Sequence, residues 1–283
     1  MRLAGRLALL LGLVAVLAGC GSSHSRRNAV NAYFDQVNTA EAGLLESIGE
    51  IDNTFAAFSL SGNKPAEITK LARAQAKIGS ALANVRALNP PADAAKVHAD
   101  IVRLLTLEHA VAHELYWTTQ FQPVYKRRLD AASAAANAFI HDLNQIGAPT
   151  ANGKPPKLTL NAALDAYATA FTSYGSSLQP IVAELDRMSA PPELRPGFVA
   201  QRTALDRSAV LCTTISTALH ERKVQAANTA IRSLFVSAAA ANGAAEQKAI
   251  RRAVAAYEAR LKQIADLTAQ VARERQKLIT ELG

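Results

Sequence analysis

Apolar residues recur along most of this chain in steps of three and four, the spacing of one face of an α-helix. One row holds this spacing over about four heptads, and it consists of Val30, Phe34, Val37, Glu41, Leu44, Ile48, Ile51, Phe55 and Phe58. The most regular row consists of Leu160, Leu164, Tyr167, Phe171, Tyr174, Leu178, Ile181, Leu185 and Met188. No segment alternates apolar and polar residues as a strand does. The pattern therefore predicts an all-α protein.

Clusters of Pro, Gly and Asn divide these rows into separate helices. They lie at residues 61–65, 89–93, 147–156, 190–193 and 242–243. Pro123 is expected to kink or end the helix before it, and Pro180 to bend its helix without ending it. We expect about six long antiparallel helices, forming an elongated bundle of two helical-hairpin units with no sheet.

The longest loop signal sets the expected domain boundary. Residues 147–157 are rich in Gly and Pro, so the sequence predicts an N-terminal helical unit at 28–146 and a C-terminal unit at 158–283. A helix, a Pro-Pro turn and another helix occur in each half, which suggests an internal duplication of a helical hairpin.

The start of the chain has the pattern of an export signal. Arg2 and Arg6 precede an apolar run at residues 7–18, which is too short for a membrane-spanning helix. The tetrad Leu17-Ala18-Gly19-Cys20 that closes it resembles the lipobox of bacterial lipoproteins. The resemblance implies removal of residues 1–19, lipidation of Cys20, a polar tether at 20–27 and an extracytoplasmic protein anchored to the cell membrane. The alternative is an ordinary signal or an uncleaved anchor with a chance cysteine.

Composition and charge narrow the class of partner. Hydrophobic residues make up 49% of the chain but aromatic residues only 5%, so the body resembles the alanine-rich helical lipoproteins of high-GC bacteria. The net charge is +8, and the segment from His220 onward holds 11 basic and 6 acidic residues. An exported basic helix meets anionic lipid or wall polymer rather than nucleic acid. The alternative is a solvated helix face without a dedicated partner.

The second cysteine and the aromatic residues suggest packing rather than chemistry. Once Cys20 is lipidated, Cys212 has no partner for an intramolecular disulfide, and its apolar helical context predicts a buried thiol. The one aromatic cluster lies near Pro123 and consists of Tyr116, Trp117, Phe121 and Tyr125. We interpret it as local packing, with a ligand pocket as the alternative.

Three histidines share a face of the helix after residue 93. His98, His109 and His113 lie within about 60° of one another around the helix axis. A pair of imidazoles four residues apart can hold zinc or copper if a third ligand arrives from another helix. The alternative is three half-buried histidines that bond to neighbouring helices. The order of residues matches neither the zinc-protease nor the di-iron motif.

Polar residues also occupy three positions in the apolar rows. Glu41, Gln75 and Glu108 should form a buried polar cluster, because buried carboxylates are costly without partners. If the helices pair as antiparallel hairpins across the turns near residues 62 and 90, Gln75 falls opposite residue 106 and Glu41 comes near His98. Such a layer either sets the register of the helices or lines a ligand cavity.

The functional expectation follows from these features together. The chain shows no phosphate-binding loop, nucleophile elbow or zinc-ribbon spacing, so we expect neither an enzyme nor a cofactor. We expect a lipid-anchored protein of the cell envelope with a binding, scaffolding or sensing role. The alternative is a metal-binding envelope lipoprotein that uses the three histidines.

Overall fold

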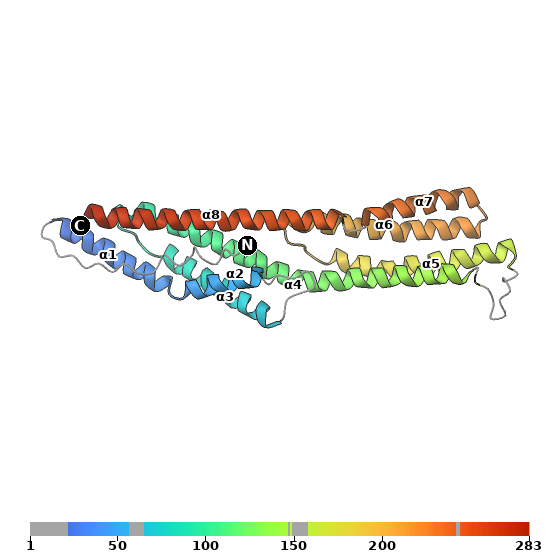
Figure 1. The fold of residues 1–283 in the computed structure, drawn as a ribbon, viewed down its shortest axis with the longest axis horizontal. Coiled ribbons are helices and arrows are strands. Elements are labelled where there is room, and N and C mark those ends of the chain that lie inside the picture. Colours follow the sequence, from blue (N-terminus) through green and yellow to red (C-terminus); the bar gives the residue numbers. More distant parts are fainter. Residues whose placement is uncertain (1–21, 57–64, 147, 149–157, 242–243, 283) are drawn as a thin grey trace. The chain divides into compact units, whose positions relative to one another are not determined.

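The computed structural model describes residues 22–56, 65–146, 148, 158–241 and 244–282, and these are almost entirely helical (Figure 1). No strand occurs in these ranges, so the predicted all-α class is confirmed. In chain order the elements are α1 (Ser22–Ala40), α2 (Leu44–Ala56), α3 (Pro65–Arg86), the short 3-10 helix η1 (Ala92–Ala94), α4 (Ala95–Gln145), α5 (Leu160–Asp186), α6 (Arg195–His220), α7 (Val224–Ala241) and α8 (Ala244–Leu282). Cys20 and the expected signal segment 1–19 lie outside the described residues.

The described part of the chain contains eight α-helices, whereas the sequence predicted about six. One additional break separates α1 from α2 at Gly43, whose φ is 77°. The other separates α6 from α7 at Arg222, whose φ is 62°. Both residues adopt the left-handed conformation that ends a helix, and only the first is the glycine that this conformation favours.

The helix α4 continues through Pro123 to Gln145, so this proline does not end it. Proline removes one backbone hydrogen bond from a helix and therefore needs compensation from packing. Phe121 and Tyr125, on either side of Pro123, are both buried, and their rings lie 5.5 Å from the ring of Phe198 on α6. This packing holds the helix together across the proline.

Two compact units divide the chain at places the sequence did not indicate. The first unit contains Met1–Gln120 and Ala255–Gly283, and the second contains Phe121–Val254. We expected the boundary in the loop 147–157, but the division falls within α4 and α8 instead, because each of these long helices contributes to both units. The C-terminal part of α8 thus belongs with the N-terminal helices.

The first unit packs α1, α2, α3 and parts of α4 and α8 around one apolar core. Contacts at Arg26–Asp93 and Tyr33–His98 show that α1 runs parallel to α4. The pairs Gln75–His113 and Arg86–Thr106 show that α3 runs antiparallel to α4. α8 is also antiparallel to α4, through Lys96–Glu274 and Asp100–Gln270. All six positions of the apolar row in α4 are buried, namely Val97, Ile101, Leu104, Glu108, Val111 and Leu115.

The second unit packs α5 against α6 and the end of α4, with α7 folded back on α6. Small residues permit close approach here: a Cβ added to Gly175 on α5 would lie 3.0 Å from Cβ of Cys212 on α6. The Cys212 side chain is fully buried, as its sequence context predicted. Leu160 and Tyr167, at the start of the row in α5, are 75% and 37% exposed, so this row is not buried along its whole length. No described helix is both long and apolar enough to cross a membrane.

Gly43 and Gly49 provide a test of the left-handed turn before α2. Gly43→Ala should destabilise the protein by about 1 kcal/mol, because a left-handed conformation is costly for residues with a Cβ. Its Cβ would also lie 2.5 Å from Nζ of Lys77, although that flexible side chain can move. Gly49→Ala, inside α2 with no atom within 4 Å of the new Cβ, should stabilise it by about 0.5–1 kcal/mol. Thermal melts of the two variants should shift in opposite directions, and a loss of stability in both would contradict the assigned turn.

Candidate functional site

Two carboxylates lie close together in the core of the first unit. Glu108 on α4 is only 6% exposed, and Glu41 follows the end of α1. Burial, together with the nearby charge of Glu41, raises the pKa of Glu108 from 4.5 to about 8. Burial also raises the pKa of Glu41. A neutral carboxyl is far cheaper to bury than a charged one, so Glu108 holds its proton at neutral pH.

Arg275 on α8 supplies positive charge to this layer. Its Nη2 donates a hydrogen bond of 2.9 Å to Oδ1 of Asn38, and its guanidinium carbon lies 4.7 Å from the centroid of the Phe34 ring. The charge of Arg275 partly offsets the effect of burial on the pKa of Glu41. Tyr33 lies in the same region, and burial raises the pKa of its hydroxyl to about 12. The layer formed by Glu41 and Glu108 can therefore hold a proton on Glu108.

Gln75 does not join the two carboxylates. Its Nε2 lies 3.0 Å from Nδ1 of His113, about two helical turns further along α4 than the predicted position near residue 106. The segment between α3 and α4 explains the difference, because residues 87–94 form an extended turn and η1 before α4 begins. Of the predicted polar cluster, the structure therefore brings together Glu41 and Glu108 and places Gln75 elsewhere.

The three histidines of α4 have different neighbours. His98 Nδ1 lies 3.0 Å from the hydroxyl of Tyr33 on α1, and burial lowers the pKa of this histidine. His113 bonds to Gln75, and His109 packs beside Gly79, where an added Cβ would lie 3.1 Å from Nε2 of His109. No group of three or more His, Cys, Asp or Glu side chains is placed to hold a metal ion within the described ranges. Metal binding by these histidines stays a prediction.

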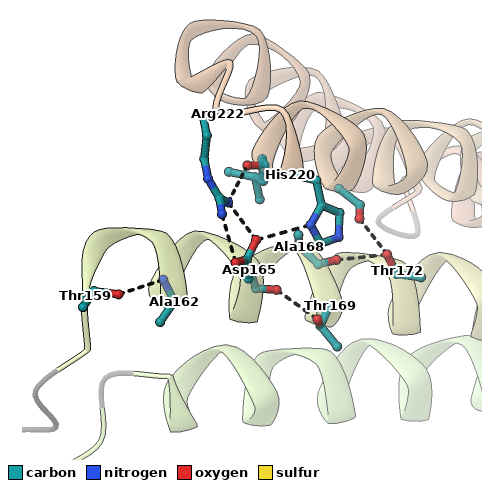
Figure 2. A network of polar contacts seen from close by, with 10 residues as sticks. Thr159, Ala162, Asp165, Ala168, Thr169, Thr172, His220 and Arg222 are labelled. Carbon is teal, nitrogen blue, oxygen red and sulfur yellow. Dashed lines mark hydrogen bonds and ion pairs between the residues drawn. The ribbon is translucent and has the colours of Figure 1, made fainter.

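A second polar group joins α5 to the end of α6 in the second unit (Figure 2). Asp165 accepts hydrogen bonds of 2.7 and 2.9 Å from the two Nη atoms of Arg222. His220 Nδ1 lies 3.3 Å from the same carboxylate. The bonds from Arg222, followed by its charge and by His220, hold the pKa of Asp165 below its usual value. The carboxylate therefore stays ionised and fixes the end of α6 to α5.

Hydroxyl groups continue this contact further along the two helices. Thr172 Oγ1 donates to the carbonyl of Ala168 (Figure 2). It also lies 2.7 Å from Oγ of Ser216. Because the single hydroxyl proton of Thr172 goes to that carbonyl, Ser216 is the donor to Thr172. Ser216 is a buried residue, 6% exposed, and this bond holds its hydroxyl. The hydroxyl is therefore not placed to act as a nucleophile.

Arg222 has a structural role beyond its charge. The amide of Lys223 donates to the carbonyl of Ala218 and that of Arg222 to Leu219, which is the Schellman pattern at the end of a helix. Arg222 occupies the left-handed position that usually holds glycine in this motif. Its bonds to Asp165 and to the Leu219 carbonyl keep the residue there.

None of the residues expected from the sequence to form a site belongs to this group, which consists of Asp165, His220 and Arg222. A usable signal was present, because counting an antiparallel hairpin outward from the Pro-Pro turn at 191–192 places Asp165 opposite the last turn of α6. The left-handed conformation of Arg222 had no such signal, since arginine has no preference for it.

No protein-family model matches the chain, and no curated protein and no solved structure was found to be similar to it.

The buried carboxyl of Glu108 predicts a dependence of stability on pH. Its pKa is higher in the folded protein than in the unfolded chain, so the folded state binds more protons and loses stability as pH rises from 4.5 to about 8. Glu108→Gln removes this proton equilibrium. The melting temperature of the variant relative to wild type should therefore increase across that range of pH.

Glu41→Gln provides the matched variant. This variant lacks the charge that helps to raise the pKa of Glu108. Its stability should therefore stop falling at a lower pH than the stability of wild type. A melting-temperature difference between Glu108→Gln and wild type that stays constant over the whole range would show that Glu108 is not a buried acid.

Arg222 offers a test of backbone strain against ion pairing. Arg222→Gly relieves the left-handed strain but loses the bonds to Asp165, whereas Arg222→Ala loses those bonds and keeps the strain. The Ala variant should be less stable than the Gly variant by about 1 kcal/mol. Denaturant unfolding of both proteins measures this difference, and equal stabilities would rule out the strained turn. Asp165→Asn should lower the stability of wild type more than that of Arg222→Gly, in which the carboxylate keeps only its contact with His220.

Proposed function

We propose that this chain is a lipid-anchored, extracytoplasmic protein of the cell envelope with a binding, scaffolding or sensing role and no catalysis. The observation that carries the proposal is the tetrad Leu17-Ala18-Gly19-Cys20 directly after a short apolar run. A lipid on the Cys20 sulfur would hold the protein at the cell membrane. The helix α1 begins at Ser22, so the tether between lipid and fold would be short.

The environment of Cys212 supports Cys20 as the site of modification. Cys212 is fully buried in α6, and burial raises the pKa of its thiol to about 12. The thiolate is the reactive form of cysteine, so Cys212 is inert at neutral pH. The sequence contains two cysteines, and Cys20 is therefore the one available to an acylating enzyme.

The distribution of charge supports an anionic partner. The second unit, Phe121–Val254, contains 15 Lys and Arg residues and 9 Asp and Glu residues. The first unit without residues 1–19 contains 14 of each. In α8, Arg260 and Lys262 pair with carboxylates, whereas Lys248, Arg251 and Arg252 are exposed. We propose that these exposed residues of the C-terminal helix face anionic lipid or wall polymer, and that nucleic acid is not a partner.

The environments of the acidic groups favour binding over catalysis. Glu108 is enclosed in the apolar core, where a substrate has no access to it. Both oxygens of Asp165 accept bonds from Arg222, which leaves this carboxylate poorly placed to act as a base. These groups hold helices together, as expected of a scaffold.

Replacing Cys20 tests the anchor. Cys20→Ser should abolish incorporation of labelled fatty acid and leave an unprocessed precursor, because only the thiol can form the thioether to a diacylglycerol. Metabolic labelling in a bacterial host, followed by electrophoresis, measures both effects.

Cys212→Ala is the matched control, since it removes the other thiol. Its labelling should equal that of wild type. Equal labelling of Cys20→Ser and wild type would refute the lipid anchor.

A further inference from the structure

The last part of α8 covers the buried carboxyl of Glu108. Arg260 on α8 pairs with Glu114 on α4. Gln270 on α8 donates a hydrogen bond of 2.9 Å to the carboxylate of Asp100 on α4. These two contacts lie on either side of Glu108, so the segment of α8 between them passes over it. Glu108 is only 6% exposed under this cover, and water reaches it only if a helix moves.

Glu41 lies at the same level of the first unit. Two contacts between α1 and α4 join residues that are 67 and 65 positions apart in the sequence. The same offset places Glu41, which follows α1, opposite residues 106–108 of α4. The charge of Glu41 contributes to the raised pKa of Glu108, which agrees with this placement. Both carboxyls cannot be charged at one buried level without a high cost in free energy.

Arg275 is the cation that offsets the charge of Glu41. In the described part of the chain, the other charged or titratable groups on the helices around this level are Tyr33 on α1, Glu46 on α2, Lys77 and Arg86 on α3, His109 on α4, and Arg260, Lys262 and Asp266 on α8. Most of these side chains are exposed, and Glu41 is the charge that acts on Glu108. Ionisation of Glu108 therefore adds a second negative charge to a layer that one arginine balances.

The last part of α8 is the helix of this unit that is held most indirectly. Residues 255–282 are separated in sequence from the other helices of the first unit by the whole second unit. The helices α1 to α4 instead follow one another along the chain. Side-chain contacts alone hold this part of α8 on the bundle, so it is the element that moves when the buried layer becomes unfavourable.

We infer that residues 255–282 of α8 form a pH-sensitive cover of the first unit, held over Glu41 and Glu108 in acid and loosened in alkali. With α8 in place, burial and Glu41 raise the pKa of Glu108 to about 8. With α8 lifted, water reaches the carboxyl and its pKa returns toward 4.5. Closing therefore binds a proton. The contribution of Glu108 to closing is complete below about pH 4.5 and is lost as pH rises through about 8.

His98 acts in the opposite direction, so it does not produce this effect. Burial lowers the pKa of His98, and a group with a lowered basic pKa stabilises the folded state as pH rises. Lifting α8 would uncover the buried side chains of Ile264, Leu267 and Val271. The inference rests on the proposed role at the cell envelope and gives its sensing function an input, the pH outside the cell.

Hydrogen–deuterium exchange locates the opening. The full-length protein in detergent is labelled at several pH values, and the exchange is corrected for the intrinsic effect of pH and read by mass spectrometry. Protection of peptides within 258–282 should fall roughly tenfold or more from about pH 6 to about pH 8, because opening releases the proton of Glu108. Peptides within 97–118 of α4 should keep their protection, since the backbone hydrogen bonds of α4 lie within that helix.

Two variants of α4 separate the buried acid from an ordinary contact. Glu108→Gln keeps the shape of the neutral carboxyl, so it should fold, and protection within 258–282 should become nearly independent of pH over this range. Glu114→Gln is the matched control, because it removes the partly exposed carboxylate that pairs with Arg260. It should lower the protection of α8 at every pH and leave the dependence on pH unchanged.

Protection of 258–282 that does not change with pH in wild type would overturn the inference, and so would a fall that persists in Glu108→Gln. An equal fall within 97–118 would overturn it as well, because the whole unit would then open and α8 would not be a separate cover. Fatty-acid labelling of Cys20 is an independent measurement, so failure of the anchor and failure of the pH response can be told apart.

Discussion

The second unit depends on close contact between helices, and several of the side chains at that contact are small. Gly175 lies against Cys212, and Ala168 and Ala227 are almost completely buried in the same core. Small apolar residues pack well in several registers, so they stabilise the contact without selecting one alignment. Polar pairs supply that selection, because sliding one helix past another would leave buried hydroxyls and carboxylates without partners. The contact between Thr172 and Ser216 has this role in the second unit.

Periodicity predicted which face of each helix is apolar, and this was most reliable where several helices enclose one row. Every position of the row in α4 is buried, including Glu108. The row in α5 is equally regular in sequence, yet Leu160 at its start is 75% exposed. A row of apolar residues determines the side that a helix can bury. Burial also requires a neighbouring helix to cover it, and the sequence of one helix does not contain that information.

The predicted site was partly right for the same reason. Glu41 and Glu108 were identified as polar residues in apolar rows, and the structure brings them together. Gln75 lies elsewhere because the turn before α4 shifts the register by about two turns, a length that cannot be read from composition. The residues around Phe121 come from three helices. The sequence therefore indicated the aromatic residues near Pro123, but it did not indicate that Oε1 of Gln122 is buried without a hydrogen-bond partner.

The polar residues of the first unit explain how its two separate chain segments stay together. This unit combines the N-terminal helices with residues that follow the whole second unit, so the last part of α8 must find its place without a connecting turn. Apolar packing alone would allow α8 to slide along the bundle. Lys96–Glu274, Asp100–Gln270 and Asn38–Arg275 each join α8 to α1 or α4 at a fixed level. Because Glu108 keeps its proton, the buried layer needs to balance only the charge of Glu41, and Arg275 from α8 supplies the opposite charge. The cost of burying Glu41 without Arg275 therefore favours the one position of α8 that brings this arginine to the layer.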